Sequence, residues 1–564
     1  MSFKYLIFNA PSAATIDRAA DLGCNWAIVH SAGIEEGLVD AASGRPMDTF
    51  PLYFEDYPKV ASYRHHQDAV WLEPLRREVT ALSERADSAG LGVAFHMYEP
   101  TLPHVFEREY PQTVGLYHRP TQSGTQYVHS HLDPDSDDTW RLVRSKYAGL
   151  AREFPLMRMV ILTTWDGAGS RWCIPEAKMP RPQRLVRMIE EAKAGVDSVR
   201  EGVTVVFRLW GRNWPREMYT RSHSEIARIT GVENADELMD PTVRAYNDPE
   251  EILPKVFKAL PPDVPVMYKS TQIDIADGQP IAACVGTYPE GREQIIEVSY
   301  EQYHRKPWPW CKVAHIRLGL AAAREHKLAG VLALPVNMGN NDRESEPERG
   351  NLGRMNTWML EQLLADSAQT DAGLVAEWLE LEFGSPQPAA AVEALLAADG
   401  IADRGVQWGG GVPARAPFAS LHSTKLYWLF DGYIDPEFPK KMADPTLDDI
   451  EALIGTKAAA HEEARRQIEA IKAARAGMSP ELYDELVGAY RTLADYVMLC
   501  RDWHSHLLVQ YAVERGLLEH SRVNLGRMSR YAESFIRNLV RLADTDAGKM
   551  ARRRISFPDP FDLT

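Results

Sequence analysis

Short apolar runs alternate with longer stretches of helical periodicity over the first 365 residues of this 564-residue chain. The runs are rich in Val, Ile, Phe and Tyr, which is typical of buried strands. Eight of them are predicted as strands, at residues 4–10, 25–31, 92–98, 158–164, 203–210, 264–270, 294–300 and 330–336. Because strands that alternate with helices form parallel sheets, the pattern predicts an α/β fold, a (β/α)8 TIM barrel with long loops.

Residues at the ends of the helical stretches support this interpretation. Ser12 is placed to be an N-cap, and Gly23 and Gly90 are placed to end the helices that precede them. After residue 365 the strand pattern stops and helical periodicity continues, with Ser479 and Pro480 opening a long helix. We therefore predict a barrel at residues 1–365 and an all-α helical domain at residues 366–564.

Composition narrows the class of protein. The chain is 45% hydrophobic, has neither a signal-peptide pattern nor eighteen consecutive apolar residues, and carries five cysteines without a CxxC pair. These features predict a cytoplasmic protein that does not span a membrane. The net charge of −16 offers no basic face for phosphates, so nucleic acid is not an expected partner and a small substrate is.

Polar residues follow the predicted strands at the end where a barrel of this type has its active site. Lys269 interrupts the apolar run VMYKSTQIDIADG at residues 266–278. The polar candidates are Asn9, His30, His96, Glu99, Asp166, Arg208, Arg212, Lys269, Asp274, Glu301 and Asn337, and the aromatic ones are Trp165, Trp210, Tyr268, Tyr303, Trp308 and Trp310. Acids among aromatic rings suit a sugar, whose CH faces stack on rings while its hydroxyls need hydrogen-bond partners. This combination favours a glycosidase.

Several ordered segments resemble the glycoside hydrolase family 67 α-glucuronidases. KSTQID (269–274) is similar to that family's Lys-Asn-Gly-Pro-x-Asp motif, and IEVSYEQY (296–303) to its segment with the second catalytic carboxylate. TTWDGAG (163–169) resembles the segment with the general acid, and VFRLW (206–210) the one whose arginine binds the substrate carboxylate. Residues 350–384 resemble the passage from the last barrel helix into the family's helical domain.

The resemblance implies an inverting, exo-acting α-glycosidase without a metal or other cofactor, which removes a terminal uronic acid or similar sugar from short imported oligosaccharides. Asp166 would be the general acid, and either Asp274 or Glu301 the base. Arg208 and Lys269 would hold the sugar carboxylate. Further contacts to the sugar are expected from His30, His96, Glu99, Trp165, Trp210, Tyr303 and Asn337.

The chain departs from the family in three ways. The family has a β-rich domain ahead of its barrel, whereas the first predicted strand here begins at residue 4. Leu162 stands where the family has a lysine that helps to bind the uronate. Asp166 replaces a glutamate and is one methylene shorter, which leaves Glu176 in the same loop as an alternative acid.

Other interpretations remain. Arg208 and Lys269 could instead form structural ion pairs with Asp166, Asp274 or Glu301. His30, His96 and Glu99 could bind a divalent metal in a sugar isomerase or lyase, and a sugar-binding protein without catalysis is a third reading. In the helical domain, the apolar side chains Trp503, Leu507, Leu508 and Tyr511 predict either core packing or a homodimer surface.

Overall fold

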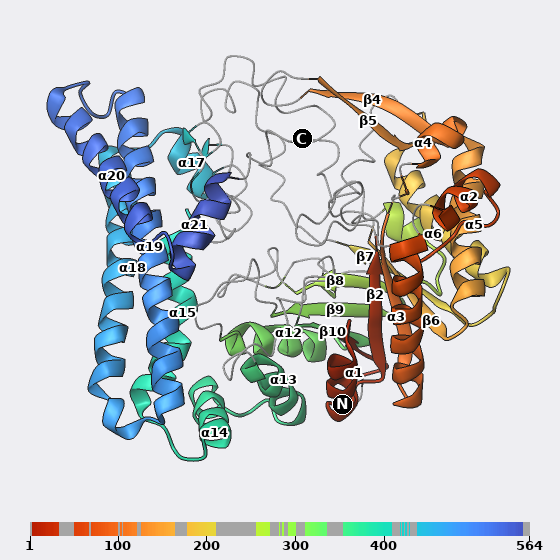
Figure 1. The fold of residues 1–564 in the computed structure, drawn as a ribbon, viewed down its shortest axis with the longest axis horizontal. Coiled ribbons are helices and arrows are strands. Elements are labelled where there is room, and N and C mark those ends of the chain that lie inside the picture. The colour runs from red at the N-terminus through yellow and green to blue at the C-terminus, as the bar shows by residue number, and fades with distance from the viewer. Residues whose placement is uncertain are drawn as a thin grey trace.

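The computed structural model describes residues 3–32, 50–66, 69–99, 102–103, 105–120, 126–163, 178–209, 255–270, 281, 285–286, 291–300, 311–335, 354–408, 418, 420–421, 424–425, 428 and 437–556. Eight parallel strands close a barrel in the order β1-β10-β9-β8-β7-β6-β3-β2 (Figure 1). They are β1 (Tyr5–Asn9), β2 (Trp26–Ala32), β3 (Gly92–Tyr98), β6 (Met157–Thr163), β7 (Thr204–Leu209), β8 (Val266–Lys269), β9 (Gln294–Ser299) and β10 (Gly330–Leu334). All eight predicted strands are confirmed.

The sheet has an apolar core on each of its two faces. One fills the barrel and draws on every strand, with Tyr5, Ile7, Ile28, Ala94, Met159, Ile161, Val206, Met267, Ile295, Leu332 and Leu334. The other lies between the strands and the helices and continues into the C-terminal helices. Because side chains alternate between the two faces of a strand, membership of the inner or outer core tells which residues face the barrel interior.

Helices cover the outside of the barrel. They are α1 (Ala13–Asp21), α2 (Pro58–His66), α3 (Ala69–Ser88), α4 (Val105–Glu109), α5 (Asp137–Glu153), α6 (Arg181–Asp197) and α12 (Val313–Glu325). Ser12 caps α1 as predicted, through a capping box with Thr15. Gly23 and Gly90 follow their helices at φ 68° and 78°, a left-handed conformation that glycine adopts at little cost.

An antiparallel hairpin that was not predicted interrupts the connection from β3 to α5. Its strands are β4 (Val114–Pro120) and β5 (Gln126–Leu132), preceded by a short 3-10 turn at Pro111–Thr113. The hairpin leaves the barrel beside α4 and runs along the top of Figure 1. It therefore belongs to the loop that follows the carboxyl end of β3, on the face where barrels of this type have their active sites.

The C-terminal part is helical, as predicted, with α13 (Met355–Ala365), α14 (Asp371–Phe383), α15 (Ala389–Val406), α17 (Glu437–Ala443), α18 (Leu447–Ala473), a 3-10 turn (Arg475–Gly477), α19 (Pro480–Glu514), α20 (Arg522–Arg541) and α21 (Asp546–Ser556). Ser479 caps α19 by accepting a hydrogen bond from the Leu482 amide. The fold class is thus a (β/α)8 barrel followed by a helical region. A buried ion pair between Lys312, at the start of α12, and Asp399 of α15 joins the two.

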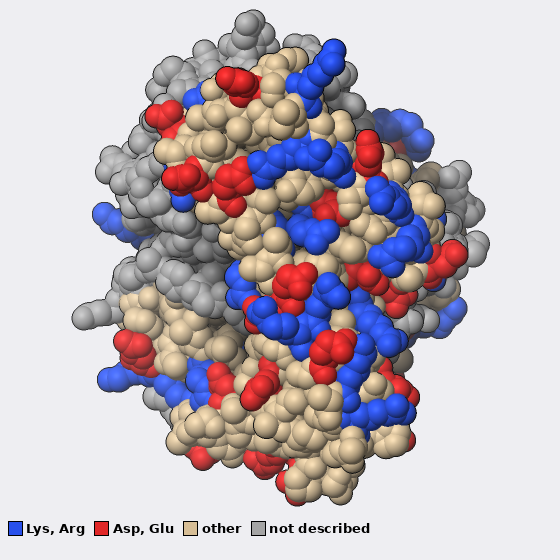
Figure 2. All heavy atoms as spheres, turned by 90° about the vertical axis from the view of Figure 1, so that its left-hand side faces the viewer, with Lys and Arg blue, Asp and Glu red and all other residues tan. Residues whose placement is uncertain are grey.

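Charged side chains of both signs are interspersed on the face formed by the C-terminal helices (Figure 2). Several of them pair between helices: Arg527 of α20 donates two hydrogen bonds to Glu451 of α18, at 2.5 and 2.7 Å. Inside this region, Asp502 of α19 accepts hydrogen bonds from Ser534 and Asn538 of α20. These contacts fix α20 on the long pair α18 and α19.

The apolar residues that suggested a dimer surface lie mainly inside the chain. Leu507, Leu508 and Tyr511 are 2% exposed or less and belong to a core cluster under α17 and α18. Trp503 is half-buried, with its ring 5.0 Å from that of Phe535. These four side chains therefore pack in or against the core of the helical region, which was the alternative to a dimer surface. No helix among the described residues has the length and apolarity needed to cross a membrane.

Candidate functional site

A buried ion pair crosses the barrel interior near the carboxyl ends of its strands. Arg208 of β7 donates Nε–H to Glu297 Oε2 at 2.5 Å and Nη2–H to Glu297 Oε1 at 2.9 Å. Both residues are at most 1% exposed. In the alternative interpretation Arg208 would pair with Asp166, Asp274 or Glu301, whereas its bidentate partner among the described residues is Glu297 of β9.

The pair continues into a hydrogen-bonded chain through Thr163 to His96. Arg208 Nη1 donates to Thr163 Oγ1 at 3.0 Å, and Thr163 Oγ1 lies 2.7 Å from His96 Nε2. Since arginine only donates, the arrangement that uses the Thr163 hydroxyl fully has Thr163 donating to Nε2. His96 Nδ1 then carries the proton and faces Ser31 Oγ at 3.4 Å. We assign this tautomer to His96.

Burial is the main reason why the pKa of His96 lies well below 6.5, and the positive charges of Arg208 and Lys269 lower it further. His96 is therefore neutral at physiological pH, as the tautomer assignment requires. In the strand ladder Arg208 pairs with Met267, two residues before Lys269 on β8, so both cations lie toward the same end of the barrel. The predicted cations Arg208 and Lys269 are thus brought together at this end of the barrel.

Lys269 ends β8 and is 5% exposed. In the strand ladder it lies directly beside Glu297, which is also the partner of Arg208. Neighbouring residues in register project to the same side of a sheet. The end of the barrel therefore holds two cations around one described carboxylate, all three deeply buried.

Glu99 directly follows β3, and its carboxylate accepts hydrogen bonds from two side chains of α5. Lys146 Nζ donates to Glu99 Oε1 at 2.6 Å, and the hydroxyl of Tyr147 donates to the same oxygen. Both charged residues are 1% exposed. Burial and the negative charge of Glu99 raise the pKa of Tyr147 well above 10. These contacts join β3 to α5 and give Glu99 a structural role in addition to the predicted contact with the sugar.

His30 is displaced by a β-bulge. The register between β2 and β3 shifts between Ile28 and His30, so that His30 pairs with Phe95 and Ser31 pairs with His96. The His30 ring packs edge-on against Phe95 at 5.7 Å, and Phe95 belongs to the outer core. A bulge inserts one residue and changes which side chains face each side of the strand. Ser31 thus takes the position beside His96 that a regular strand would give to His30.

Leu162 is fully buried in the outer core, between the strands and the helices. Its neighbour Thr163 faces the inside of the barrel, where it contacts Arg208 and His96. A lysine at position 162 would therefore point away from the interior. Leucine in place of the lysine of the resembling family is consistent with the apolar packing at this position.

Most of the predicted catalytic and aromatic residues lie outside the described residues. These are Asp166, Asp274, Glu301, Trp165, Trp210, Arg212, Tyr303, Trp308, Trp310 and Asn337, together with the alternative acid Glu176. Their roles stay predictions. In the part of the chain that the structure does describe, no three His, Cys, Asp or Glu side chains form a group that could hold a metal ion.

Two site residues were missed by the sequence analysis. Glu297 stands inside the apolar run QIIEVSY, and Lys146 stands among the buried residues of α5. A charge inside an apolar run is the signal that identified Lys269, and the same signal was present at Glu297. Lys146 gave no such signal, because lysine is common on the exposed faces of helices.

The described residues thus form a (β/α)8 barrel with a buried polar centre, and a helical region follows the barrel. No family model and no curated protein sequence matches the chain. Among solved structures, the fold is similar to a GH138 enzyme targeting pectin rhamnogalacturonan II, with a TM-score of 0.56 and 12% identity over 97% of this chain. This chain spans 60% of the length of that protein. A mutant of the Thermobaculum terrenum O-GlcNAc hydrolase gives a TM-score of 0.42 and 10% identity, over 98% of this chain and 94% of the other. Both are glycoside hydrolases.

Proposed function

We propose that the protein is a glycoside hydrolase that removes a terminal α-linked uronic acid, or a similar anionic sugar, from a short oligosaccharide. The observation that carries the proposal is the pair of buried cations, Arg208 and Lys269, at the carboxyl ends of neighbouring barrel strands. Burying two cations is costly unless anions compensate them. Two cations at neighbouring strand ends would bind the carboxylate of a uronic acid, the arginine through two hydrogen bonds and the lysine as a point charge.

The fold supports the same class of reaction. In barrels of this type the reacting groups stand at the carboxyl ends of the strands, where the buried polar centre lies. The likeness to a GH138 enzyme supports the barrel architecture, and the short motifs around Asp166, Asp274 and Glu301 support the choice of acids.

The proposed mechanism is inversion with two carboxyl groups. Asp166 donates a proton to the leaving oxygen, and either Asp274 or Glu301 takes a proton from a water on the opposite face of the sugar. Such a reaction requires carboxyl groups about 6.5–9.5 Å apart, which leaves room for that water. Arg208 and Lys269 bind the sugar carboxylate, and Glu297, Thr163 and His96 hold Arg208 in place.

The test is a hydrolysis screen on α-linked glucuronide, galacturonide and neutral oligosaccharides, with and without EDTA. We expect release of uronic acid that EDTA does not affect. Loss of activity with EDTA would instead support a metal-dependent isomerase or lyase. Binding of uronides without turnover would indicate a sugar-binding protein and contradict the proposal.

A further inference from the structure

Helix α12 packs against the strands that carry the buried polar centre. It lies along β9 and β10, on the side of the barrel nearest the helical region (Figure 1). Lys269 and Glu297 face the inside of the barrel, and side chains alternate between the two faces of a strand. Ser270 and Val298, which directly follow them, therefore face outward. Val298 belongs to the outer core, as this orientation requires.

The first contact between α12 and these strand ends is polar. His315 Nε2 lies 3.4 Å from Ser270 Oγ, and both residues are at most 3% exposed. The Ser270 amide also donates to the Glu297 carbonyl at 2.8 Å. Ser270 is thus bonded to β9 on one side and contacts His315 on the other, directly after Lys269 in the chain. A shift of Ser270 would therefore move Lys269 relative to Glu297.

The second contact is a close approach at Gly319, which lies four residues after His315 and so on the same side of α12. A Cβ atom at Gly319 would lie 2.6 Å from Val298 Cγ2 and 3.5 Å from Ser270 Cβ. The first distance is too short, since carbon atoms pack at about 3.5–4.0 Å. Glycine is unfavourable inside a helix, and the close approach is the physical reason for a glycine at this position.

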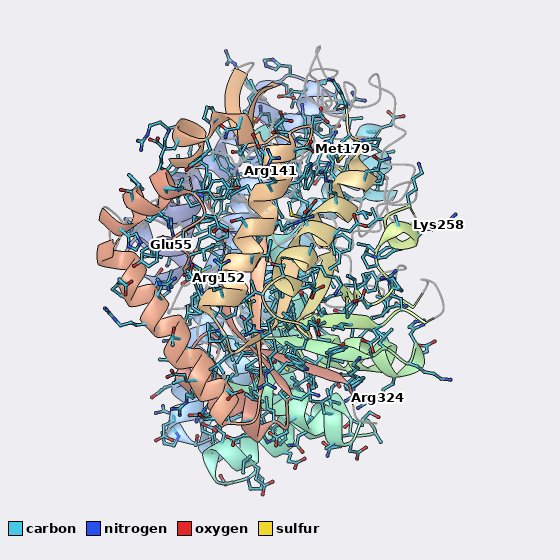
Figure 3. The ribbon with its side chains drawn as sticks, turned by 90° about the vertical axis from the view of Figure 1, so that its right-hand side faces the viewer. Glu55, Arg141, Arg152, Met179, Lys258 and Arg324 are labelled. Atoms are coloured by element: carbon cyan, nitrogen blue, oxygen red, sulfur yellow. The ribbon has the colours of Figure 1, made fainter. Side chains whose placement is uncertain are left out.

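The helical region holds α12 at both ends. At its start, Lys312 forms an ion pair with Asp399 of α15, and the two side chains are 0% and 3% exposed. In its last turn, Arg324 donates to the carbonyls of residues 363 and 364 of α13 at 2.7 and 3.3 Å. Figure 3 shows Arg324 toward the end of the molecule opposite Met179. Because both ends are anchored, α12 is a fixed support for the strand ends that it contacts.

We propose that α12 positions the buried polar centre, and that His315 and Gly319 set the distance between Lys269 and Glu297. Both are positioning residues, since each acts through the strand residue that it contacts. A charge-assisted hydrogen bond depends on short distances and good alignment, so a small shift of Lys269 weakens its contact with an anion. The effect on sugar binding rests on the proposed function, in which Lys269 binds the carboxylate of a uronic acid.

The matched variants are Gly319→Ala and Gly488→Ala. Gly488 lies in α19, where an added Cβ would have no other atom within 4 Å. We compare KM and kcat for nitrophenyl α-glucuronide and nitrophenyl α-glucoside. Gly319→Ala should raise KM for the glucuronide about 10-fold relative to the glucoside, as expected when one hydrogen bond to a charged group is lost. Gly488→Ala should change this ratio less than about twofold.

Substitutions of His315 test the polar contact. His315→Leu should change the ratio of KM values in the same direction as Gly319→Ala. His315→Gln keeps an amide that can reach Ser270 and should restore most of the ratio. Partial unfolding lowers the amount of active protein and therefore kcat for both substrates, but it leaves the ratio of KM values unchanged. Equal changes of KM for the two substrates would mean that α12 only packs on the barrel and would overturn the proposal.

A measurement of stability separates the positioning from the proposed reaction. The losses from Gly319→Ala and Glu297→Gln should together exceed the loss in the double variant, because a displaced α12 already weakens the contacts of Glu297. Losses from Gly488→Ala and Glu297→Gln should add, since these sites are independent. Urea midpoints measure both cycles. Additive losses in both would overturn the proposal, whether or not the protein hydrolyses uronides. A non-additive first cycle in a protein that acts on no uronide would support positioning by α12 and contradict the proposed function.

Discussion

Replacing Glu297 with glutamine should destabilise the protein by about 3–5 kcal/mol, the usual effect of removing one partner of a buried ion pair. Glutamine has nearly the same shape but offers only one acceptor oxygen, and its amide group would face an Arg208 N–H. Arg208 is 1% exposed, so water cannot compensate its charge. The loss is a large fraction of the stability of a typical domain, about 5–15 kcal/mol.

A double-mutant cycle isolates the pair. Arg208→Met leaves the Glu297 carboxylate buried without its main cation and should be destabilising to a similar extent. The double variant Arg208→Met, Glu297→Gln removes both charges and should lose less stability than the sum of the two single losses. The measurement is the urea midpoint of each protein, followed by fluorescence and circular dichroism so that separate transitions are recognised.

Arg404 and Glu463 provide the control cycle. Their side chains are 46% and 30% exposed and pair at 2.6 Å. An exposed pair typically contributes about 0–1 kcal/mol, so the coupling at Arg404 and Glu463 should be several-fold smaller than at Arg208 and Glu297. Equal coupling energies in the two cycles, or additive losses at Arg208 and Glu297, would refute the reasoning that the barrel end depends on this ion pair.

Three further outcomes are expected. Asp166→Asn should nearly abolish hydrolysis of a sugar-linked substrate but spare an activated nitrophenyl substrate, and NMR in the first minutes should show a β product from an α substrate; an early α product would contradict inversion. Lys269→Met should weaken uronide binding far more than binding of neutral analogues in calorimetric titrations, and equal losses would make Lys269 structural. Burial and Arg501, which donates to His461 Nδ1 at 3.1 Å, lower the pKa of His461 to about 4. Between pH 6.5 and 4 the unfolded chain therefore binds a proton that the folded protein does not, so stability should fall with decreasing pH by up to about 3 kcal/mol, and His461→Gln should lose less in urea titrations across that range.

The barrel could be predicted because its strands are buried on both faces and therefore appear as continuous apolar runs. The hairpin could not be found by the same criterion. VGLYHRP and QYVHSHL mix polar and apolar residues, so neither is a continuous apolar run. A search for period-two alternation would have detected both strands, since the five residues between them, TQSGT, are rich in turn formers.

Single residues of the candidate site could be proposed from the sequence, but their pairing could not. Lys269 was selected as a charge in an apolar run and Arg208 as a polar residue at a strand end, and both lie toward the carboxyl ends of their strands. Their partners depend on register, which brings Glu297 beside Lys269 and across from Arg208. Neither this register nor the bulge before His30 has a signal in the local sequence, because both result from the closure of the whole barrel.

The Arg208–Glu297 pair also changes how the proposed carboxylate recognition divides between the cations. An arginine has five N–H groups, and three of those in Arg208 are bonded to Glu297 and Thr163. Its charge is already balanced by Glu297, and the third cation of the resembling family is replaced by Leu162, which packs in the outer core. In the proposed carboxylate recognition Arg208 is thus held in place by Glu297 and Thr163, and comparison of the Lys269→Met and Arg208→Met variants on uronic and neutral sugars measures what each cation contributes.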